Sequence, residues 1–314
     1  MRKLVLVAVC ALALVPNASA GIYLGVFGDD ARFQSLTGQR SDSNPVILGW
    51  NQGRTWGRLF PAWEAYLGPV PMLGIKTHSR GVEAVTPRGI AMGRGDAYLI
   101  SINRAVANWG KPVTYVRPLA EMNGYWNDYC AFNANGTGRG ATHTTAWFRQ
   151  AFRRMYIIFH GGTKSAVNAK LAAIGLPGVS VDLDDNPYPA LRVIWNPQGY
   201  GAPNIPRNSA QAYYPGNAYV DVVANDLYDQ HYKAEWTANQ ALYAAHPTKP
   251  YAIGEWGLWG IDDAAFIRQM ANFVKTHPRV ELIAYYDSHL GSTFDLGPKS
   301  RSRAAYRTYI LPLG

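Results

Sequence analysis

Short apolar runs recur along the chain, and most are separated by longer stretches in which apolar residues return at every third or fourth position. Short runs that are rich in Val, Ile and Tyr, and are bounded by turn-forming residues, are typical of buried strands. Eight such runs predict strands at residues 22–28, 45–50, 72–78, 113–121, 191–197, 219–228, 251–257 and 281–287.

Three of the intervening stretches have a clear helical period. They cover residues 95–110, 144–161 and 262–277. The third has Asp262 as its expected N-cap and Pro278 just beyond its end. Strands that alternate with helices indicate parallel pairing, and eight of them predict a closed barrel. The expected fold class is therefore α/β, a (β/α)₈ TIM barrel in a single domain over residues 21–314.

The first twenty residues follow a different pattern. Arg2 and Lys3 precede an apolar run of twelve residues, and small residues end the segment at Ala20. This pattern predicts a secretory signal peptide that is removed before Gly21. The run is shorter than the roughly 20 residues that a membrane-spanning helix needs. We therefore expect a secreted protein with no membrane span.

Charge and cysteine content narrow the class of protein. The formal charge of +9 becomes +7 without Arg2 and Lys3, since 28 basic residues then face 21 acidic ones. The densest basic clusters, 148–154 and 299–307, lie in helix-like segments, so we interpret them as solvated faces and expect no nucleic-acid partner. Cys130 is alone after the signal segment, which excludes an internal disulfide, and no local motif marks it as reactive.

Two long irregular segments follow strands. Residues 130–143 come after the fourth predicted strand and residues 200–218 after the fifth, whereas 175–190 precede the fifth. Loops that follow strands form the catalytic face of a barrel. The segments 130–143 and 200–218 are therefore predicted to wall a cleft.

Polar and aromatic residues stand at the carboxyl ends of the predicted strands, which converge on one pocket in a barrel. They are Trp50, His78, Glu121, Trp195, Asn196, Tyr228 and Glu255. Glu121 and Glu255, on the fourth and seventh strands, are expected to face each other. Cleavage of a glycosidic bond needs two such carboxyl groups, one protonated and one ionised. From position alone, two carboxylate metal ligands or two structural carboxylates paired with arginines remain open alternatives.

The segment "RPLAEMNGYW", residues 117–126, resembles the acid/base segment of glycoside hydrolase family 26, which belongs to clan A of the (β/α)₈ glycosidases. The likeness extends over about residues 70–290. It is carried by residues 89–126, 146–160, 191–199, 213–229 and 249–257.

The resemblance implies a role for each matching residue. Glu121 would be the general acid/base and Glu255 the nucleophile. Tyr228 would hydrogen-bond the nucleophile, and Arg117 would hold a carboxylate in its charged form. The expected substrate-binding residues are Trp50, His78, Asn123, Trp126, Trp195, Trp256 and Tyr286. For Trp126 and Trp256 core packing remains an equal alternative, and for His78 and His231 a structural role is favoured over a catalytic one.

Two positions depart from the family pattern. Ala120 stands where the family has a histidine that contacts the sugar, and Tyr286 stands where the clan commonly has a tryptophan platform. We expect Tyr286 to substitute for that platform. Ala120 is expected to shift substrate choice without abolishing activity, because alanine offers no hydrogen bond.

These observations predict a secreted, monomeric, retaining hydrolase of β-linked polysaccharide. The resemblance makes β-1,4-mannan the leading substrate and an endo-β-mannanase-like activity the leading reaction; β-1,3-xylan and mixed-linkage β-glucan remain open. A non-catalytic carbohydrate-binding protein on the same fold is the alternative from another class. No cofactor or metal is expected, since the acidic run at 182–185 lacks the spacing of a calcium loop.

Overall fold

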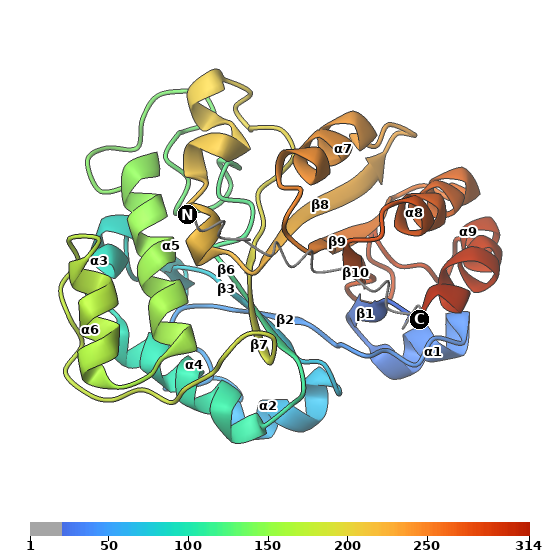
Figure 1. Cartoon of the computed structure of the whole chain (residues 1–314). Coiled ribbons are helices and arrows are strands. Elements are labelled where there is room, and N and C mark those ends of the chain that lie inside the picture. The colour runs from blue at the N-terminus through green and yellow to red at the C-terminus, as the bar shows by residue number, and fades with distance from the viewer. Residues whose placement is uncertain (1–20) are drawn as a thin grey trace, which may run out of the picture.

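Eight parallel strands form one sheet that curls into a barrel (Figure 1). The computed structural model describes residues 21–314, so the predicted signal peptide lies outside the described residues. The strand order is β1-β10-β9-β8-β7-β6-β3-β2. The strands are β1 Tyr23–Phe27, β2 Val46–Leu48, β3 Met72–Ile75, β6 Thr114–Pro118, β7 Leu191–Trp195, β8 Val222–Gln230, β9 Tyr251–Trp259 and β10 Val280–Tyr286. Each predicted strand overlaps one of these, and the predicted fold class is confirmed.

The barrel is closed between β1 and β2 by the segment that precedes β2. The amide of Val26 donates to the carbonyl of Ser43 at 3.0 Å, and the amide of Asp42 donates to the carbonyl of Leu24 at 2.8 Å. The Asp42 carboxylate adds a third bond by accepting from the amide of Leu24 at 2.8 Å. This short seam replaces the ladder that joins the other neighbouring strands.

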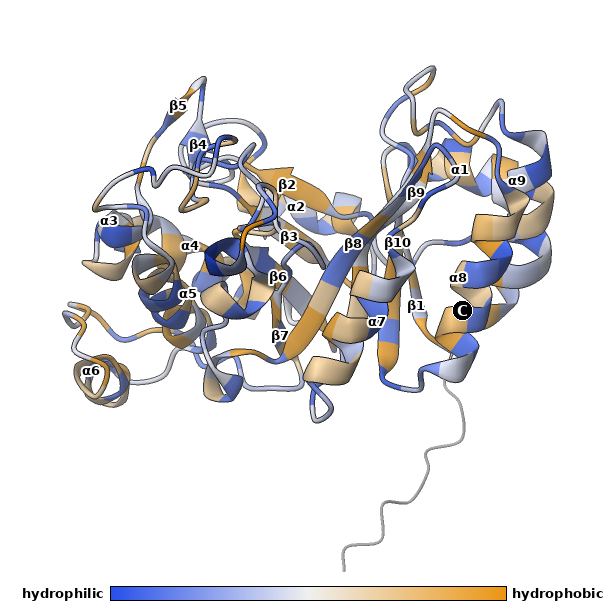
Figure 2. Ribbon diagram, turned by 90° about the horizontal axis from the view of Figure 1, so that it is seen from above, coloured by the Kyte–Doolittle hydropathy of each residue, from blue (hydrophilic) through white to orange (hydrophobic). Residues whose placement is uncertain are grey.

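Helices cover the outside of the sheet and bury its outward-facing residues (Figure 2). They are α1 Asp30–Thr37, α2 Phe60–Leu67, α3 Pro87–Ala91, α4 Asp96–Trp109, α5 Thr145–His160, α6 Lys164–Ala172, α7 Trp236–Ala245, α8 Ala264–Thr276 and α9 Ser300–Ala305. A two-stranded hairpin of β4 His78–Ser79 and β5 Val82–Glu83 follows β3. The three predicted helices correspond to α4, α5 and α8.

The N-cap of α8 is Asp263, so the expected cap Asp262 was wrong by one residue. The Asp263 carboxylate accepts from the amide of Ala265 at 2.8 Å. Asp262 instead accepts from the amide and hydroxyl of Ser302, at 2.8 and 2.6 Å, in the first turn of α9. From the sequence, either of the two adjacent aspartates could cap the helix. The contact of Asp262 with α9 leaves Asp263 as the cap.

The inside of the barrel is apolar at its amino end and polar at its carboxyl end. A separate cluster of buried residues fills the lower part, among them Met72, Tyr115, Val222, Ala252 and Leu282. Side chains in a strand alternate between its two faces. The face of β6 that carries Tyr115 therefore next carries Arg117, and polar groups begin one layer above the apolar plug.

Candidate active site

Glu255 lies at the centre of the polar layer and is 8% exposed. Its Oε1 accepts from Nη1 of Arg117 at 2.6 Å, and its Oε2 accepts from the hydroxyl of Tyr228 at 2.8 Å. Burial and the nearby Glu255 raise the pKa of Tyr228 well above its usual value, so this hydroxyl remains a donor. One cation from β6 and one phenol from β8 thus orient both carboxylate oxygens.

A bulge in β9 turns Glu255 toward the barrel interior. Asn225 pairs with Ile253, but the next residue of β8, Asp226, pairs with Glu255, so Gly254 is left as the extra residue. Such a bulge changes which face the following side chains occupy. A Cβ at position 254 would lie 2.1 Å from Oδ1 of Asn196 and 3.0 Å from Nε of Arg117. The bulge therefore requires glycine.

We expect Gly254→Ala to lose most activity while leaving the outer barrel folded. The added methyl must displace Asn196 or Arg117, and overpacking of this kind costs about 1–3 kcal/mol. Thermal melting and the initial hydrolysis rate measure the two effects. Gly257→Ala in the same strand is the control, because its Cβ would meet nothing closer than 3.4 Å. Equal activity of both variants would contradict this account of the bulge.

Glu121 lies beyond β6, in a turn, and the prediction that the strand continues to residue 121 was wrong. β6 ends at Pro118, and Leu119 and Glu121 have positive φ values of 53° and 55°. Left-handed residues other than glycine interrupt an extended strand and cluster at functional sites. The Glu121 amide donates to the carbonyl of Asn196 at 2.7 Å, which ties this turn to the end of β7.

Neutral donors hold the carboxylate of Glu121. Its Oε2 accepts from Nε1 of Trp126 at 2.7 Å, and its Oε1 accepts from Nε2 of Gln198. Glu255 by contrast accepts from a guanidinium. The two glutamates therefore have different partners: neutral donors hold Glu121, whereas a cation and a phenol hold Glu255.

Asp226 is a third carboxyl group of this cluster, and the sequence analysis missed it. It is 3% exposed, and its Oδ2 accepts from Nη2 of Arg117. Burial raises its pKa well above the usual value; Arg117 opposes this rise, and the charges of Glu255 and Glu121 add to it. Three carboxyl groups around one guanidinium favour the binding of a proton. The sequence did mark this residue: Asp226 precedes Tyr228 by two positions, so both side chains are expected on the same face of the strand.

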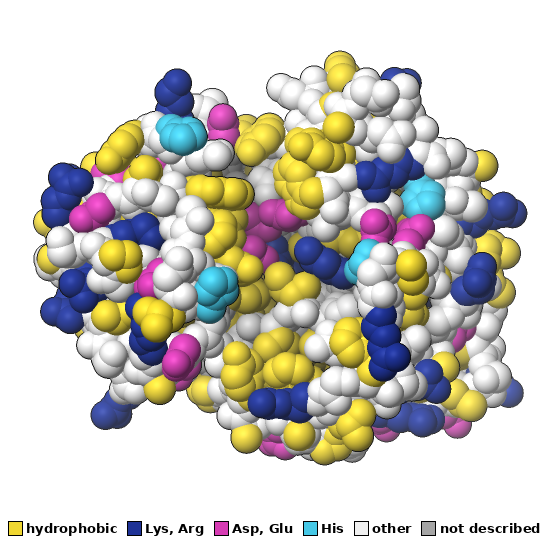
Figure 3. Space-filling model, turned by 180° about the vertical axis from the view of Figure 1, so that it is seen from behind, with side chains coloured by type: hydrophobic (Ala, Val, Ile, Leu, Met, Phe, Trp, Pro, Cys, Tyr) yellow, Lys and Arg dark blue, Asp and Glu magenta, His cyan; other side chains and the backbone are white. Residues whose placement is uncertain are grey.

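Both glutamates line one cleft of about 690 Å³ at the carboxyl end of the barrel. In Figure 3, which views this end, acidic side chains lie at the bottom of a hollow with apolar side chains around it. The exposed indoles of Trp126 and Trp259 line the cleft, as does Tyr286. The geometry therefore combines two carboxyl groups with aromatic surfaces suited to sugar rings.

Elongated strands form one wall of the cleft. β8 continues to Gln230 and β9 to Trp259, two residues beyond their predicted ends, and His231 and Lys233 follow. Of the two segments predicted to form walls, 200–218 contributes Tyr200. The segment 130–143 contributes no lining residue within the described chain. Its Arg139 instead binds the carbonyls of Asn127 and Asp128 at 2.6 and 3.0 Å.

Three tryptophans expected to bind substrate lie in the core. Trp50, Trp195 and Trp256 are 3%, 0% and 0% exposed, and none lines the cleft. Their rings pack edge-on against tyrosines. Trp256 follows Glu255 directly, so when Glu255 points inward the indole points outward to the helices. For these three residues the substrate-binding prediction was wrong.

Asn123 and His78 also lie away from the cleft surface. Asn123 is fully buried, and its amide donates to the carbonyls of Gln198 and Tyr200 at 2.9 and 3.1 Å. It therefore holds the loop that carries Gln198. His78 is exposed, with Nδ1 2.6 Å from Oδ2 of Asp128, and is absent from the cleft lining.

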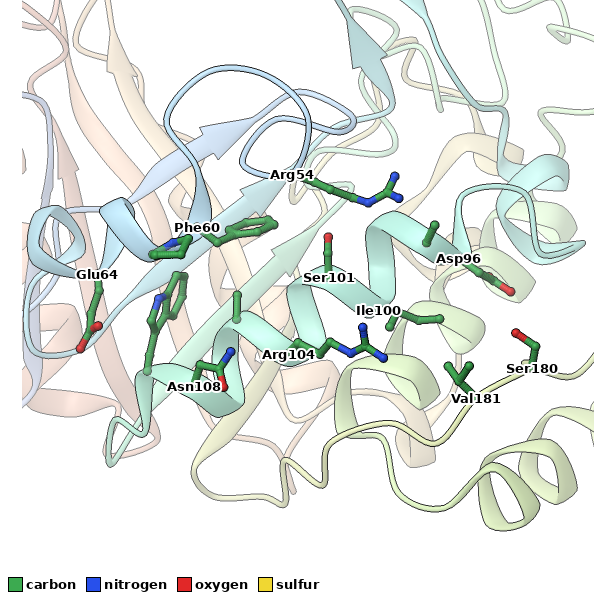
Figure 4. A pocket seen from close by; sticks show the side chains of 14 residues that line it. Arg54, Phe60, Glu64, Asp96, Ile100, Ser101, Arg104, Asn108, Ser180 and Val181 are labelled. Atoms are coloured by element: carbon green, nitrogen blue, oxygen red, sulfur yellow. The ribbon is translucent and has the colours of Figure 1, made fainter.

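A second hollow of about 620 Å³ lies outside the barrel between α2 and α4 (Figure 4). Its two acidic residues are already paired, Asp96 with Arg154 at 2.5 Å and Glu64 with Lys111 at 2.9 Å. Over residues 21–314 the structure contains no group of three or more His, Cys, Asp or Glu side chains that could hold a metal ion.

No protein-family model and no curated protein matches this sequence. Solved structures do match. Bacillus subtilis mannanase BCman superimposes with a TM-score of 0.57 at 17% identity, over 92% of this chain and 85% of that one. A family 26 β-mannanase from Bacteroides ovatus gives 0.57 at 15% identity, over 92% and 88%. A Cellulomonas fimi endo-β-1,4-mannanase superimposes with a TM-score of 0.60 at 17% identity, over 92% of this chain and 70% of that one.

The chain has the fold of the family 26 β-mannanases. The likeness covers nearly the whole described barrel, which extends the resemblance first noted in the segment 117–126. Within residues 21–314, none of the helices is both long and apolar enough to cross a membrane. The likeness to the family 26 mannanases is one of fold.

Proposed function

We propose that this protein is a secreted glycoside hydrolase that cleaves β-linked polysaccharide with retention of configuration. The observation that carries the proposal is the pair of glutamates in one cleft with different partners. Glu255 accepts from Arg117 and Tyr228, whereas Glu121 accepts from the neutral side chains of Trp126 and Gln198. A double displacement needs an ionised nucleophile and a second carboxyl group that gives and then takes a proton.

The proposed reaction has two steps. Glu255 attacks the anomeric carbon while Glu121 protonates the departing glycosidic oxygen, and a glycosyl-enzyme ester forms. Glu121, now ionised, then removes a proton from water, which attacks the same carbon and releases Glu255. Trp126 contacts Glu121 directly, so a sugar stacked on this indole lies beside the acid/base.

The leading substrate class is β-1,4-mannan, because the structural neighbours are mannanases by name. The test is incubation with β-mannan, β-1,3-xylan, mixed-linkage β-glucan and acidic β-glycans, followed by measurement of released reducing ends. Release that disappears in Glu255→Gln supports the proposal. A non-catalytic sugar-binding protein would instead bind oligosaccharides and return them intact.

Ala120 gives a prediction on substrate choice. Its carbonyl accepts from the hydroxyl of Tyr129 at 2.6 Å, which fixes the backbone beside Glu121, but its methyl group offers no contact to a hydroxyl of the sugar. We expect Ala120→His to raise kcat/KM on β-mannan about tenfold or more, since one polar contact contributes about 1–3 kcal/mol. Initial rates on β-mannan measure this. An unchanged rate would show that the position does not affect substrate choice.

Export is the remaining part of the proposal. The segment 1–20 has the basic start, apolar run and small-residue end of a signal peptide. We expect N-terminal sequencing of protein from the culture medium to begin at Gly21. A secreted product that still begins at Met1 would contradict cleavage at this position.

A further inference from the structure

A small cavity of about 110 Å³ opens beside Ala120, below the main cleft. Both glutamates, Tyr286 and Lys76, the residue after β3, line it. Its volume is about one sixth of that of the main cleft, so it suits a substituent of a sugar bound in that cleft. The short side chain of Ala120 leaves this space open.

Lys76 is the unusual member of the lining. It is half-buried, and among residues 21–314 its ammonium has no hydrogen bond or ion pair. Other partly buried lysines of the chain are satisfied: Lys299 donates to the carbonyls of Thr293 and Asp295, and Lys249 to that of Val220. A lysine that lines a cavity and has no ion pair of its own can bind an anion there.

The two glutamates that line the cavity form no ion pair with Lys76. Glu255 is held by Arg117 and Tyr228, and Glu121 by Trp126 and Gln198. Arg117, the other cation of the lining, is saturated by Glu255, Asp226 and Asn196. Lys76 is therefore the cation of this cavity that is free to bind a ligand.

We propose that Lys76 binds a carboxylate of the sugar at the cleavage point, so that the substrate is an acidic β-glycan that contains uronic acid. A second lysine, Lys233, lines the outer cleft, and basic side chains lie in the hollow of Figure 3. The formal charge of +7 over residues 21–314 also attracts a polyanionic chain. The inference rests on the proposed hydrolase function and adds the acidic group to it.

Matched oligosaccharides test this inference. β-1,4-Mannohexaose and the β-1,4-mannuronate hexamer share linkage and configuration and differ in oxidation at C6; cellohexaose and the β-1,4-glucuronate hexamer form a second pair. The measurement is kcat/KM from released reducing ends for the wild type, Lys76→Met, Lys76→Arg and Lys170→Met. Methionine keeps the apolar stem, arginine keeps the charge, and Lys170 is an exposed lysine on α6.

In one pair or both we expect the wild type to cleave the acidic member, and Lys76→Met to lower the acidic-to-neutral ratio about 10- to 100-fold, the effect of one charge-assisted hydrogen bond. Lys76→Arg should retain part of the preference and Lys170→Met all of it. Cleavage of neutral members alone, or an unchanged ratio in Lys76→Met, overturns the inference and leaves the hydrolase proposal standing.

Absence of cleavage on every substrate would count against the hydrolase proposal instead. Binding of the two acidic hexamers to Glu255→Gln, measured by isothermal titration calorimetry, then decides the inference. Binding that is lost in Lys76→Met/Glu255→Gln supports it, and absence of binding to both hexamers overturns it.

Discussion

Glu255→Ala is expected to lose hydrolysis of both polysaccharide and activated aryl glycosides by several orders of magnitude, because no covalent intermediate can form without the nucleophile. Glu121→Ala is expected to behave differently. An aryl leaving group departs without a proton, so this variant should retain much of its first-step rate on an aryl glycoside and accumulate the glycosyl-enzyme.

Added azide separates the two roles further. Azide needs no general base and fits the space left by the Glu121 carboxylate, so it should restore turnover of Glu121→Ala and yield a β-glycosyl azide. If azide helps Glu255→Ala, the product should have the opposite anomeric configuration. Initial rates with and without azide, and proton NMR of the products, measure these outcomes. Exchanged patterns, or near-normal activity of Glu255→Ala, would reverse the assignment.

Arg117→Met is expected to abolish activity and to lower the free energy of unfolding by about 3–5 kcal/mol at neutral pH. Arg117 is 1% exposed and pairs with both Glu255 and Asp226. Removing one partner of a buried pair leaves uncompensated charge, which costs about that amount. Arg301→Met is the control, because Arg301 is 70% exposed where it pairs with Asp262, and loss of such a surface pair costs about 0–1 kcal/mol.

The loss in Arg117→Met should depend on pH. Burial already raises the pKa of Asp226 in the folded protein, and without the guanidinium it should rise further. A carboxyl group whose pKa is higher in the folded state favours folding when protonated, and this contribution is lost as pH rises through the folded pKa. The deficit should therefore shrink toward pH 4 and grow toward pH 8 in urea unfolding. A deficit independent of pH would contradict this account of Arg117.

The strand positions could be predicted from the sequence because each strand carries a short run of buried apolar residues. The ends were harder to place. β8 and β9 continue through Gln230 and Trp259, which line the cleft and are not part of the buried apolar runs. β6 stops early because Leu119 and Glu121 adopt left-handed backbone, which neither residue type favours. Contacts with β7, distant in sequence, hold that conformation.

The candidate site was predicted in part for a similar reason. Glu121, Tyr228 and Glu255 were predicted to lie together because each stands at the end of a predicted strand. The structure places all three in one cleft. The tryptophans could not be assigned this way, because a cleft and a core both accept indoles. The bulge at Gly254 decides the faces of Glu255 and Trp256, and no pattern of apolar residues marks it. Lys76 was not predicted as a site residue because it lies inside the predicted strand 72–78 and not at its end.

The seam between β1 and the segment before β2 makes this edge of the barrel easier to open than the ladder between β8 and β9. Eight residue pairs join β8 to β9, whereas a few bonds around Leu24, Val26, Asp42 and Ser43 close the seam. Local opening begins where few bonds must break together. Under native conditions the amides of Val26 and Asp42 should therefore exchange their hydrogens before those of β8 and β9. Glu255 lies on β9 and Glu121 in the turn after β6, both away from this edge, so the barrel can fluctuate at its seam while the two glutamates keep their positions.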